Sequence, residues 1–227
     1  MRRDEVGTGA GGFASRRRVA GVKVLRAAAL PFCVLALAVA LSLLAPVPEG
    51  LGQGKGKGAG HSHAGGKEGA KARAEIKGDG VTGTAEFVEV EHGTARVVHV
   101  TVRLKGDVAK LTPGLHGIHI HEKGACEPPF TSAGGHFDPG PAGNSDPDVN
   151  HPFHMGDLPN IRVGADGSGT LEAATTRVTL SDGPLSVFDA DGSAIIIHGR
   201  EDQMTSGASK SGVSGGPRLA CGVISRQ

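Results

Sequence analysis

Gly117-Ile118-His119-Ile120-His121-Glu122 carries the plainest structural signal in the sequence. Apolar and imidazole side chains alternate along it, which is typical of a β-strand with two unlike faces. His119 and His121 are therefore expected on one face, and Ile118 and Ile120 on the other. Two imidazoles side by side on a strand form half of a metal site, but an exposed pair of histidines would have the same pattern. Both interpretations stay open on this segment alone.

The composition predicts an all-β domain. The 227 residues include 38 glycines and seven phenylalanines but no tryptophan or tyrosine, so valine, isoleucine, leucine and alanine have to form the core. Such a composition is typical of short strands joined by turns. The formal net charge of +1 gives no argument for a nucleic-acid partner, and we expect none.

Alternating apolar and polar residues predict two strands at Val81–Val90 and Ala95–Leu104, joined by a hairpin loop. Two long irregular segments, 130–159 and 199–217, are expected to be functional loops, because loops of this length are uncommon in compact domains. This pattern predicts an antiparallel β-sandwich or barrel of about eight strands. The further strands are expected at 160–163, 169–177, 187–188, 194–198 and 219–224.

The N-terminal part has the layout of an export signal. A basic segment, residues 1–26, precedes an apolar run, residues 27–46, which is close to the length that spans a bilayer. The run is either a cleaved signal peptide or a retained membrane anchor. Either way the remainder is expected to be exported, to a periplasmic, extracellular or cell-envelope location.

Residues 47–72 are rich in glycine, lysine and histidine and are expected to form a flexible linker before a folded domain at 73–227. His61 and His63 lie in this linker, either as solvated residues or as a loose metal-capturing pair. Cys33 lies in the apolar run, which leaves Cys126 and Cys221 in the domain, a number that fits one disulfide.

The folded domain is rich in side chains that bind metals. Imidazole suits copper and zinc, and an added carboxylate suits zinc. Many of these side chains lie in glycine-rich loops or at the ends of expected strands, where a closed sheet could bring them together. The candidates are His116, His119, His121, His136, His151, His154, Asp157, His198 and Asp202.

Four segments resemble signature segments of the copper/zinc superoxide dismutase family, and they occur in the same order. They read HGIHIHE (116–122), TSAGGHFDP (131–139), HMGDLPN (154–160) and GGPRLACGVI (215–224). The resemblance covers about residues 75–227 and says nothing about residues 1–72.

The resemblance implies a Greek-key fold, copper and zinc as cofactors, and conversion of the superoxide anion to oxygen and hydrogen peroxide by one-electron cycling of a histidine-ligated copper beside a structural zinc. It also implies a role for each matching residue. The residues that resemble the copper ligands are His119, His121, His136 and His198, and His136 also resembles the ligand that reaches zinc. Two further residues, His154 and Asp157, resemble zinc ligands, and Asp202 resembles the carboxylate that links the two metal sites. Arg218 resembles the arginine that guides the anion, His116 resembles a structural histidine, and Cys126 and Cys221 resemble the family's disulfide.

One zinc ligand departs from the family pattern. The family usually has a further zinc histidine about eight residues after the bridging one, where this sequence reads Gly143-Asn144-Ser145. His151 is the remaining candidate, three residues before His154. Two histidines at this spacing either both face one metal or act as one ligand and one hydrogen-bonded neighbour. In the second case the site would bind zinc weakly or hold copper alone.

Two other functions compete with the enzyme. A non-catalytic copper carrier or store would be indicated by loss of a copper ligand or of Arg218, and neither is lost. A structural barrel without metal would leave five or more histidines without a role. The sequence gives no prediction of the oligomeric state, and beyond superoxide the one partner expected is a membrane, if residues 27–46 are retained.

Overall fold

The computed structural model describes residues 66–141 and 143–227. The basic N-terminal segment, the apolar run, and His61 and His63 lie outside these residues, so the predictions made for them are not tested by the structure. Among the described residues, no helix is long and apolar enough to cross a membrane.

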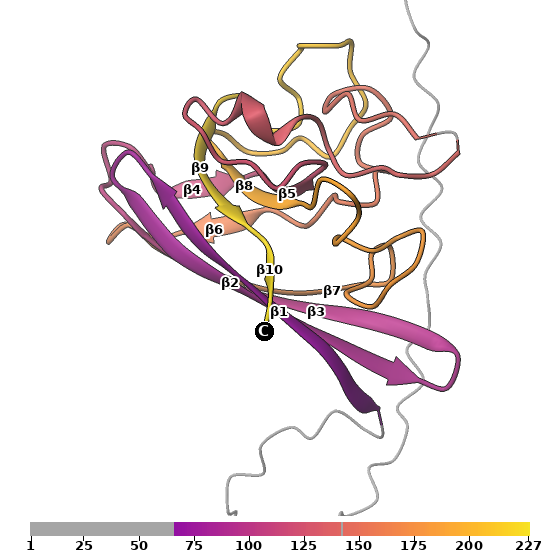
Figure 1. The fold of residues 1–227 in the computed structure, drawn as a ribbon. Coiled ribbons are helices and arrows are strands. Elements are labelled where there is room, and N and C mark those ends of the chain that lie inside the picture. Colours follow the sequence, from indigo (N-terminus) through magenta and orange to yellow (C-terminus); the bar gives the residue numbers. More distant parts are fainter. Residues whose placement is uncertain (1–65, 142) are drawn as a thin grey trace, which may run out of the picture. The chain divides into compact units, whose positions relative to one another are not determined.

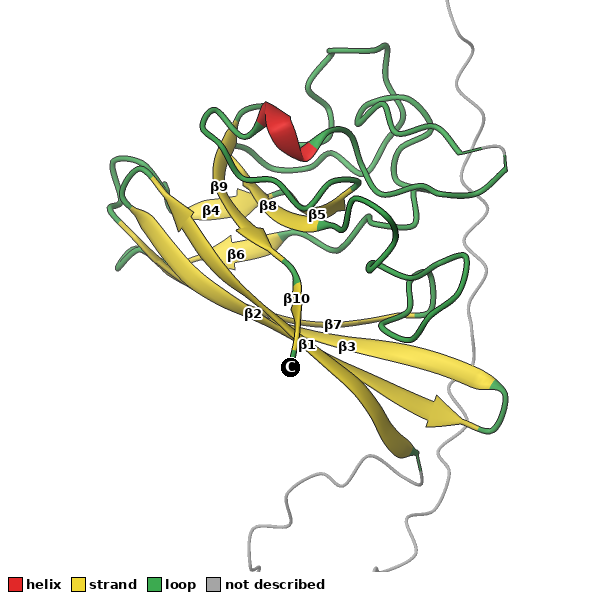
Figure 2. Cartoon of the chain, viewed as in Figure 1, coloured by secondary structure: helices red, strands yellow, loops and turns green. Residues whose placement is uncertain are grey.

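The described chain is built almost wholly of β-strands (Figures 1 and 2). One short 3-10 helix, η1 (Thr131–Ala133), lies in the long loop after β5. The strands are β1 (Lys67–Gly78), β2 (Val81–His92), β3 (Ala95–Gly106), β4 (Gly114–His116), β5 (Ile118–His121), β6 (Ile161–Val163), β7 (Ser168–Thr175), β8 (Ala194–His198), β9 (Arg218–Val223) and β10 (Ser225–Arg226).

The strands form one antiparallel sheet that is nearly closed into a barrel. Its order is β4-β6-β7-β3-β2-β1-β9-β8-β5, and β10 pairs with β1. The two outermost strands, β4 and β5, are separated in sequence only by Gly117. The two ends of the sheet must therefore meet at this glycine. Because β3–β4 and β7–β8 connect strands that are not neighbours, the topology is of the Greek-key type.

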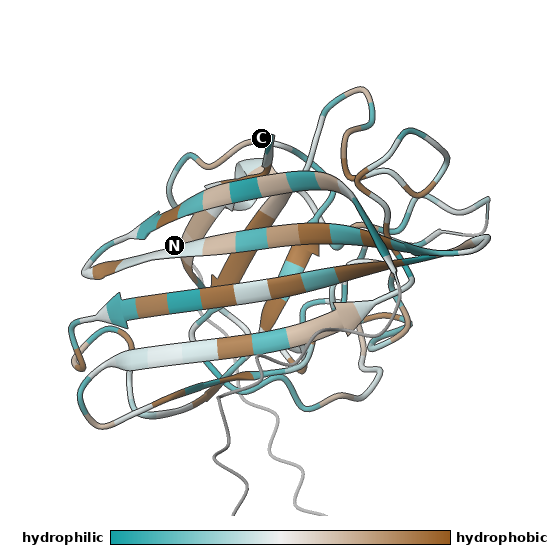
Figure 3. Cartoon of the chain, turned by 90° about the horizontal axis from the view of Figure 1, so that it is seen from below, coloured by the Kyte–Doolittle hydropathy of each residue, from teal (hydrophilic) through white to brown (hydrophobic). Residues whose placement is uncertain are grey.

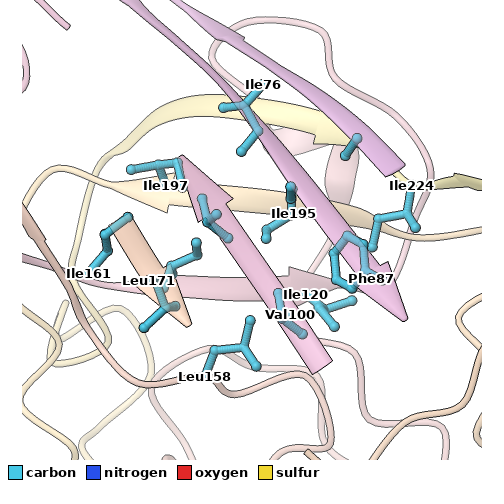
Figure 4. Close-up of a cluster of buried hydrophobic side chains, with 14 of the residues drawn as sticks. Ile76, Phe87, Val100, Ile120, Leu158, Ile161, Leu171, Ile195, Ile197 and Ile224 are labelled. Carbon is cyan, nitrogen blue, oxygen red and sulfur yellow. The ribbon is translucent and has the colours of Figure 1, made fainter. Parts of the chain in front are cut away.

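Alternation along the strands separates a core from a solvent face. In Figure 3 hydrophilic and hydrophobic residues alternate along the long strands. Ala72, Ala74 and Ile76 of β1 are buried, and the residues between them are exposed or partly exposed. Isoleucine, valine and leucine fill most of the interior, joined by Phe87 and Phe137. Figure 4 shows side chains from both halves of the barrel meeting in this core.

The long loops that carry the candidate site residues lie on the side of β5 and β8 (Figure 2). The disulfide Cys126–Cys221 joins the first of these loops to β9 across a sequence separation of 95 residues. In the chain-entropy account, a crosslink of this span stabilises the folded state by about 4–5 kcal/mol. The structure confirms the predicted disulfide, which fixes the loop beside the strand that begins at Arg218.

The structure corrects several details of the expected elements. β1 begins at Lys67, so the linker expected through residue 72 ends earlier and the folded domain begins before 73. Val187 and Phe188 do not form a strand; the neighbouring Ser186 makes an isolated bridge with Thr179. The sheet has ten strands instead of about eight, because β1, β4 and β10 were not expected. β1 was missed because its buried positions are mostly alanines between charged residues.

Glu89 on β2 anchors the segment before β8 and is only 1% exposed. Its carboxylate accepts hydrogen bonds from the backbone N–H of Leu180 (2.7 Å), the backbone N–H of Ser181 (3.2 Å) and the Ser181 hydroxyl (2.7 Å). Burial acts to raise the pKa of Glu89, but the hydrogen bonds from Ser181 and Leu180 outweigh burial and lower it. The ionised group therefore stabilises the fold above the usual glutamate pKa of about 4.3, and this contribution is lost as the pH falls through the lowered value.

We expect Glu89→Gln to lower the free energy of unfolding at pH 7 by about 1–3 kcal/mol, because it leaves buried donors poorly satisfied. It should also weaken the loss of stability below about pH 4.3. Urea unfolding at several pH values measures both effects. The control is Glu86→Gln, since the Glu86 side chain is exposed and forms only a surface ion pair, with 3.7 Å between its Oε2 and the Arg103 guanidinium. Equal stability of Glu89→Gln and the wild type at pH 7 would contradict the anchoring role.

Candidate metal centre

β5 presents its two histidines and its two isoleucines to opposite sides, as the alternation predicted. Ile118 and Ile120 are fully buried in the hydrophobic core. His119 and His121 are also fully buried, but they face the long loops. The backbone of His121 forms a β-bridge with that of His136, and the backbone of His119 forms one with that of Asp157. The strand thus places two imidazoles in a rigid frame between the core and the loops.

Four buried imidazoles come together around this strand. His119 and His121 come from β5, His136 from the long loop after β5, and His198 from the last position of β8. One ring nitrogen from each can be chosen so that all four lie within 4.8 Å of one another. The ring centres of His119 and His136 are 4.1 Å apart, and those of His119 and His198 are 4.9 Å apart.

Each of the four rings has one nitrogen bound to the protein and one without a hydrogen-bond partner among the residues that the structure describes. His119 donates through Nε2 to Asp202 (2.9 Å), and His136 through Nδ1 to Asp157 (2.7 Å). His121 and His198 donate through Nδ1 to the carbonyls of Gly134 (3.2 Å) and Gly216 (3.1 Å). Buried polar atoms are rarely left unsatisfied, so the remaining nitrogens indicate a ligand. These nitrogens are His119 Nδ1, His121 Nε2, His136 Nε2 and His198 Nε2.

The four rings are held in the neutral form that a metal requires. Burial lowers the pKa of His119 and His136 to about 4 and that of His198 to about 3. Burial also lowers the pKa of His121 well below its usual value. Neutral imidazoles with a free nitrogen are suitable ligands for copper or zinc at neutral pH.

A second group of donors surrounds the carboxylate of Asp157. His136 Nδ1 lies 2.7 Å from Oδ1, while His151 Nδ1 and His154 Nδ1 lie 3.2 Å and 3.0 Å from Oδ2. Burial acts to raise the pKa of Asp157, but the hydrogen bonds from the three histidines outweigh it and hold the pKa far below its usual range. Three imidazoles and one ionised carboxylate form a donor set that suits tetrahedral zinc.

His119 also lies close to this second group, since a set of ligand atoms from His119, His136, His151 and Asp157 falls within 4.8 Å. His119 fits the first group better, because its Nε2 is bound to Asp202 and its Nδ1 is the unpaired atom. His154 fits the second group better, because both its Nδ1 and its backbone N–H contact Asp157 Oδ2.

Asp202 connects the two groups. One of its oxygens accepts a hydrogen bond from His119 Nε2 (2.9 Å), and the other accepts one from His151 Nε2 (2.7 Å). His151 thereby has its Nδ1 directed toward Asp157 Oδ2, 3.2 Å away. His151 thus lies between Asp157 and Asp202, although it is far in sequence from the position where the family pattern has a histidine.

Arg218 lies beside the first group at the start of β9. Its guanidinium is half-buried and donates to the carbonyls of Phe130 and Gly134, each over 2.6 Å. A cavity of about 430 Å³ is lined by His198, Arg200, Lys210 and Arg218. Asp146 and Asp148 also line it, so its three cationic side chains exceed its carboxylates by one and leave a net positive charge on the approach to His198. A larger cavity of about 990 Å³ lies beside the disulfide and shares Arg218, but none of the candidate ligands lines it.

Comparison with known proteins agrees with this geometry. Residues 81–224, well over half of the chain, match the family model described as copper/zinc superoxide dismutase. The chain belongs to the copper/zinc superoxide dismutase family. A Cu-Zn superoxide dismutase of Deinococcus radiodurans is 42% identical over 155 residues, which cover 63% of this chain and 77% of the relative.

Two further relatives are also named as Cu-Zn superoxide dismutases. A Cu-Zn superoxide dismutase of Caulobacter vibrioides is 40% identical over 165 residues, which cover 67% of this chain and 84% of the relative. A protein of Brugia pahangi named as an extracellular Cu-Zn superoxide dismutase is 33% identical over 151 residues, covering 63% of this chain and 69% of the relative.

Two further side chains lie near the site, and the sequence did not point to the second of them, Asn160. His116, expected to be structural, has both ring nitrogens occupied, by the carbonyls of His198 (2.8 Å) and Thr112 (2.7 Å). Asn160 holds Asp202 in place through two hydrogen bonds, to its backbone carbonyl (2.8 Å) and from its backbone N–H (2.9 Å). Backbone carbonyls have no sequence signal, and a lone asparagine at the start of a strand has a weak one.

We expect Asp202→Asn to lower the pKa of His151 in the metal-free protein. Burial acts to lower this pKa, but hydrogen bonds and charges from Asp157 and Asp202 raise it to about 9. Removing the Asp202 charge leaves Asp157 alone to oppose burial, so His151 should lose its proton at a lower pH. Titration of the histidine ring signals by NMR measures the change, and exposed His92 is the internal control. An unchanged value for His151 would contradict its contact with Asp202.

Proposed function

We propose that this protein is an exported superoxide dismutase that converts two superoxide anions and two protons to oxygen and hydrogen peroxide. The observation that carries the proposal is the convergence of four buried, neutral imidazoles, each with one unpaired nitrogen. The family relationship supports the same activity and implies copper and zinc as cofactors. A carrier or a metal-free barrel finds no comparable support, since the four copper-type histidines and Arg218 are all in place.

We assign the copper ligands to His119, His121, His136 and His198, and the zinc ligands to His136, His151, His154 and Asp157. The donor sets support this assignment, because the first contains only imidazoles and the second adds a carboxylate. Copper supplies the one-electron redox couple that the reaction requires, which zinc lacks.

Arg218 would bind and orient the substrate. Its two carbonyl partners fix the guanidinium beside His198, so that its charge faces the cavity that superoxide has to enter. Excess positive charge in a cleft concentrates anions and raises association rates, by about 10–10³-fold where all the charge has one sign; here three cations outweigh the carboxylates of Asp146 and Asp148. Arg200 and Lys210 line the same cavity and add to the field.

His136 would serve both metal sets and the proton transfer. Its Nδ1 faces Asp157, and its unpaired Nε2 faces the copper-type imidazoles. In the metal-free protein Asp157 fixes the tautomer and the orientation of the ring through this hydrogen bond; with zinc present, Nδ1 and Asp157 would both be ligands. Nε2 is then the atom at which His136 can hold a proton for the substrate.

His151 would replace the zinc histidine that the family pattern places earlier in the loop. Its Nδ1 lies 3.2 Å from Asp157 Oδ2, and its Nε2 is fixed by Asp202. Arg177 supports the segment by donating to the carbonyls of Pro152 (3.0 Å) and His154 (3.2 Å). The close spacing of His151 and His154 therefore allows both rings to face the same ion.

The proposed export rests on the N-terminal sequence. The basic segment and the apolar run 27–46 have the order of an export signal, and the disulfide fits an oxidising compartment. The relative from Brugia pahangi is named as extracellular. We further propose that the run either acts as a cleaved signal or tethers the domain to a membrane, and N-terminal sequencing of the mature protein distinguishes the two.

We expect His151→Ala to bind about one copper per chain but to lose most of its zinc, because one of four zinc ligands is removed. His92→Ala should bind both metals like the wild type, since His92 is exposed and lies in neither donor set. Metal analysis of the purified proteins, together with zinc competition titrations, gives the result. Zinc bound to His151→Ala with wild-type affinity would refute the assignment and favour His151 as a hydrogen-bonded neighbour only.

We expect Arg218→Ala to lower the rate of superoxide consumption by about tenfold, and Arg218→Glu to lower it further, because charge at this position controls the approach of the anion. Arg218→Lys should retain part of the rate. The rates are measured at several salt concentrations on protein with verified copper content, and the dependence on salt should weaken in Arg218→Ala. If copper-loaded wild-type protein consumes no superoxide, the proposed function itself is wrong.

A further inference from the structure

Asp148 is a buried carboxylate that belongs to neither donor set. It lies in the long loop after β5, three residues before His151, and its exposed fraction is 4%. Its carboxylate accepts hydrogen bonds from the backbone N–H of Gly212 (2.8 Å), the backbone N–H of Ser214 (3.1 Å) and the Ser214 hydroxyl (2.9 Å). All three donors belong to the loop between β8 and β9, so one side chain joins two segments that are far apart in sequence.

The segment that Asp148 holds, residues 212–216, forms a wall against His198. The carbonyl of Gly216 accepts the hydrogen bond from His198 Nδ1 (3.1 Å), and this bond leaves Nε2 as the free nitrogen. The backbone at Gly215 approaches so closely that an added Cβ would lie 2.8 Å from His198 Cβ. The orientation of the His198 ring therefore depends on the position of this wall.

The wall has little means of holding itself in place. Its sequence is Gly-Val-Ser-Gly-Gly, and Gly212 and Gly216 adopt left-handed backbone conformations with φ of 76° and 66°. Such a segment gains little from side-chain packing and has a high conformational entropy when released. The backbone N–H groups of Gln203 and Arg200 donate to the carbonyls of Val213 (2.8 Å) and Gly215 (3.0 Å) within the same loop. The three hydrogen bonds to Asp148 tie residues 212–214 to the other long loop.

We infer that Asp148 is a positioning residue for the reaction, because it fixes the wall that orients His198 and borders the cavity of Arg218. The inference rests on the proposed function for its catalytic meaning, while the contact itself is independent of it. Asp148 also lines the same cavity as His198 and Arg218. It acts through other groups and has no contact with the candidate ligands among the described hydrogen bonds.

A carboxylate suits this position better than other side chains. Three donors converge on it, and an ionised carboxylate accepts through both oxygens without presenting a donor of its own. Burial acts to raise the pKa of Asp148, but the hydrogen bonds from Gly212 and Ser214 outweigh it and lower the pKa. The group is therefore charged at neutral pH, and charge-assisted hydrogen bonds are about twice as strong as neutral ones.

The connection continues along the chain toward the zinc-type donors. The backbone carbonyl of Asp148 accepts a hydrogen bond from Gly207 N–H (2.8 Å), and that of His151 accepts one from the Ser206 hydroxyl (2.7 Å). The segment from Asp148 to His151 thus lies along the loop from Ser206 to Ser214. Displacement of either segment would be transmitted to His198 on one side and to His151 on the other.

The test uses Asp148→Asn, which keeps the size of the side chain but places an amide NH₂ against converging N–H donors. Hydrogen exchange by NMR is first measured on the metal-free protein. The amides of Gly212 and Ser214 should exchange at least about tenfold faster than in the wild type, and the amides of β8 should not change. Asp146→Asn is the matched control, since Asp146 lies in the same segment and bonds through Oδ2 to Ser209 and not to the wall. Its Oδ1 accepts from the backbone N–H of Asp148 (3.1 Å), a hydrogen bond that the amide oxygen of asparagine can keep.

The second measurement uses copper-loaded protein. Asp148→Asn should shift the visible absorption band of bound copper(II) and lower the rate of superoxide consumption by about tenfold, whereas Asp146→Asn should leave the absorption band in place. A band that moves reports a reoriented ligand, which a purely stabilising role of Asp148 would not produce.

Unchanged exchange at Gly212 and Ser214, or an unchanged band and rate, would overturn the inference. If the wild-type protein is inactive but exchange increases in Asp148→Asn, the proposed function fails while the positioning contact stands. Should Asp148→Asn fail to fold, Ser214→Ala removes one of the three hydrogen bonds and should give a smaller effect in the same directions. Wild-type exchange and absorption in that variant would equally count against the inference.

Discussion

Each of the four copper-type imidazoles has to bind one protein acceptor in order to keep its other nitrogen free. A neutral imidazole has one N–H donor and one unprotonated nitrogen, and the acceptor partner decides which nitrogen is which. The acceptors are the carbonyls of Gly134 and Gly216 and the carboxylates of Asp157 and Asp202. None of them lies on a strand. The free nitrogens can therefore converge only if the loops that carry the acceptors are fixed as firmly as the strands.

The barrel supplies the rigid half of this arrangement. β5 and β8 pair with each other, and the fully buried isoleucines between them hold His119, His121 and His198 at defined heights. Gly117 allows the sheet to close, because Ser214, Asp202 and His119 all approach the position where its side chain would be. The loops are fixed by other means: the disulfide, the guanidinium of Arg218 on two carbonyls, and the carboxylates of Asp148 and Asp202 on the loop between β8 and β9. Polar contacts and the disulfide thus fix the loops, whereas hydrophobic packing fixes the strands.

The sequence predicted the parts of this arrangement that depend on local pattern. The period of two placed His119 and His121 opposite Ile118 and Ile120, and the resemblance to the family pointed to His136 and His198 as the remaining copper-type histidines. The strand β1 was missed because small alanines at its buried positions give a weak pattern. The environment of His151 could not be predicted, since its contacts with Asp157 and Asp202 join residues up to 51 positions apart. The acceptors at Gly134 and Gly216 are backbone carbonyls of residues without a side chain, so no search for functional residue types could have found them.

The two donor sets cannot respond independently of each other. Asp202 bonds to one histidine of each set, His136 contributes one nitrogen to each, and the segment from Asp148 to His151 lies along the wall that holds His198. A metal bound between His151, His154 and Asp157 would fix this segment and, through it, the orientation of His198. Because His151 lies only three residues before His154, the stretch from 137 to 150 carries no candidate ligand. This stretch contributes Asp148 to the other loop, and that contact links the segment of His151 to the wall that holds His198.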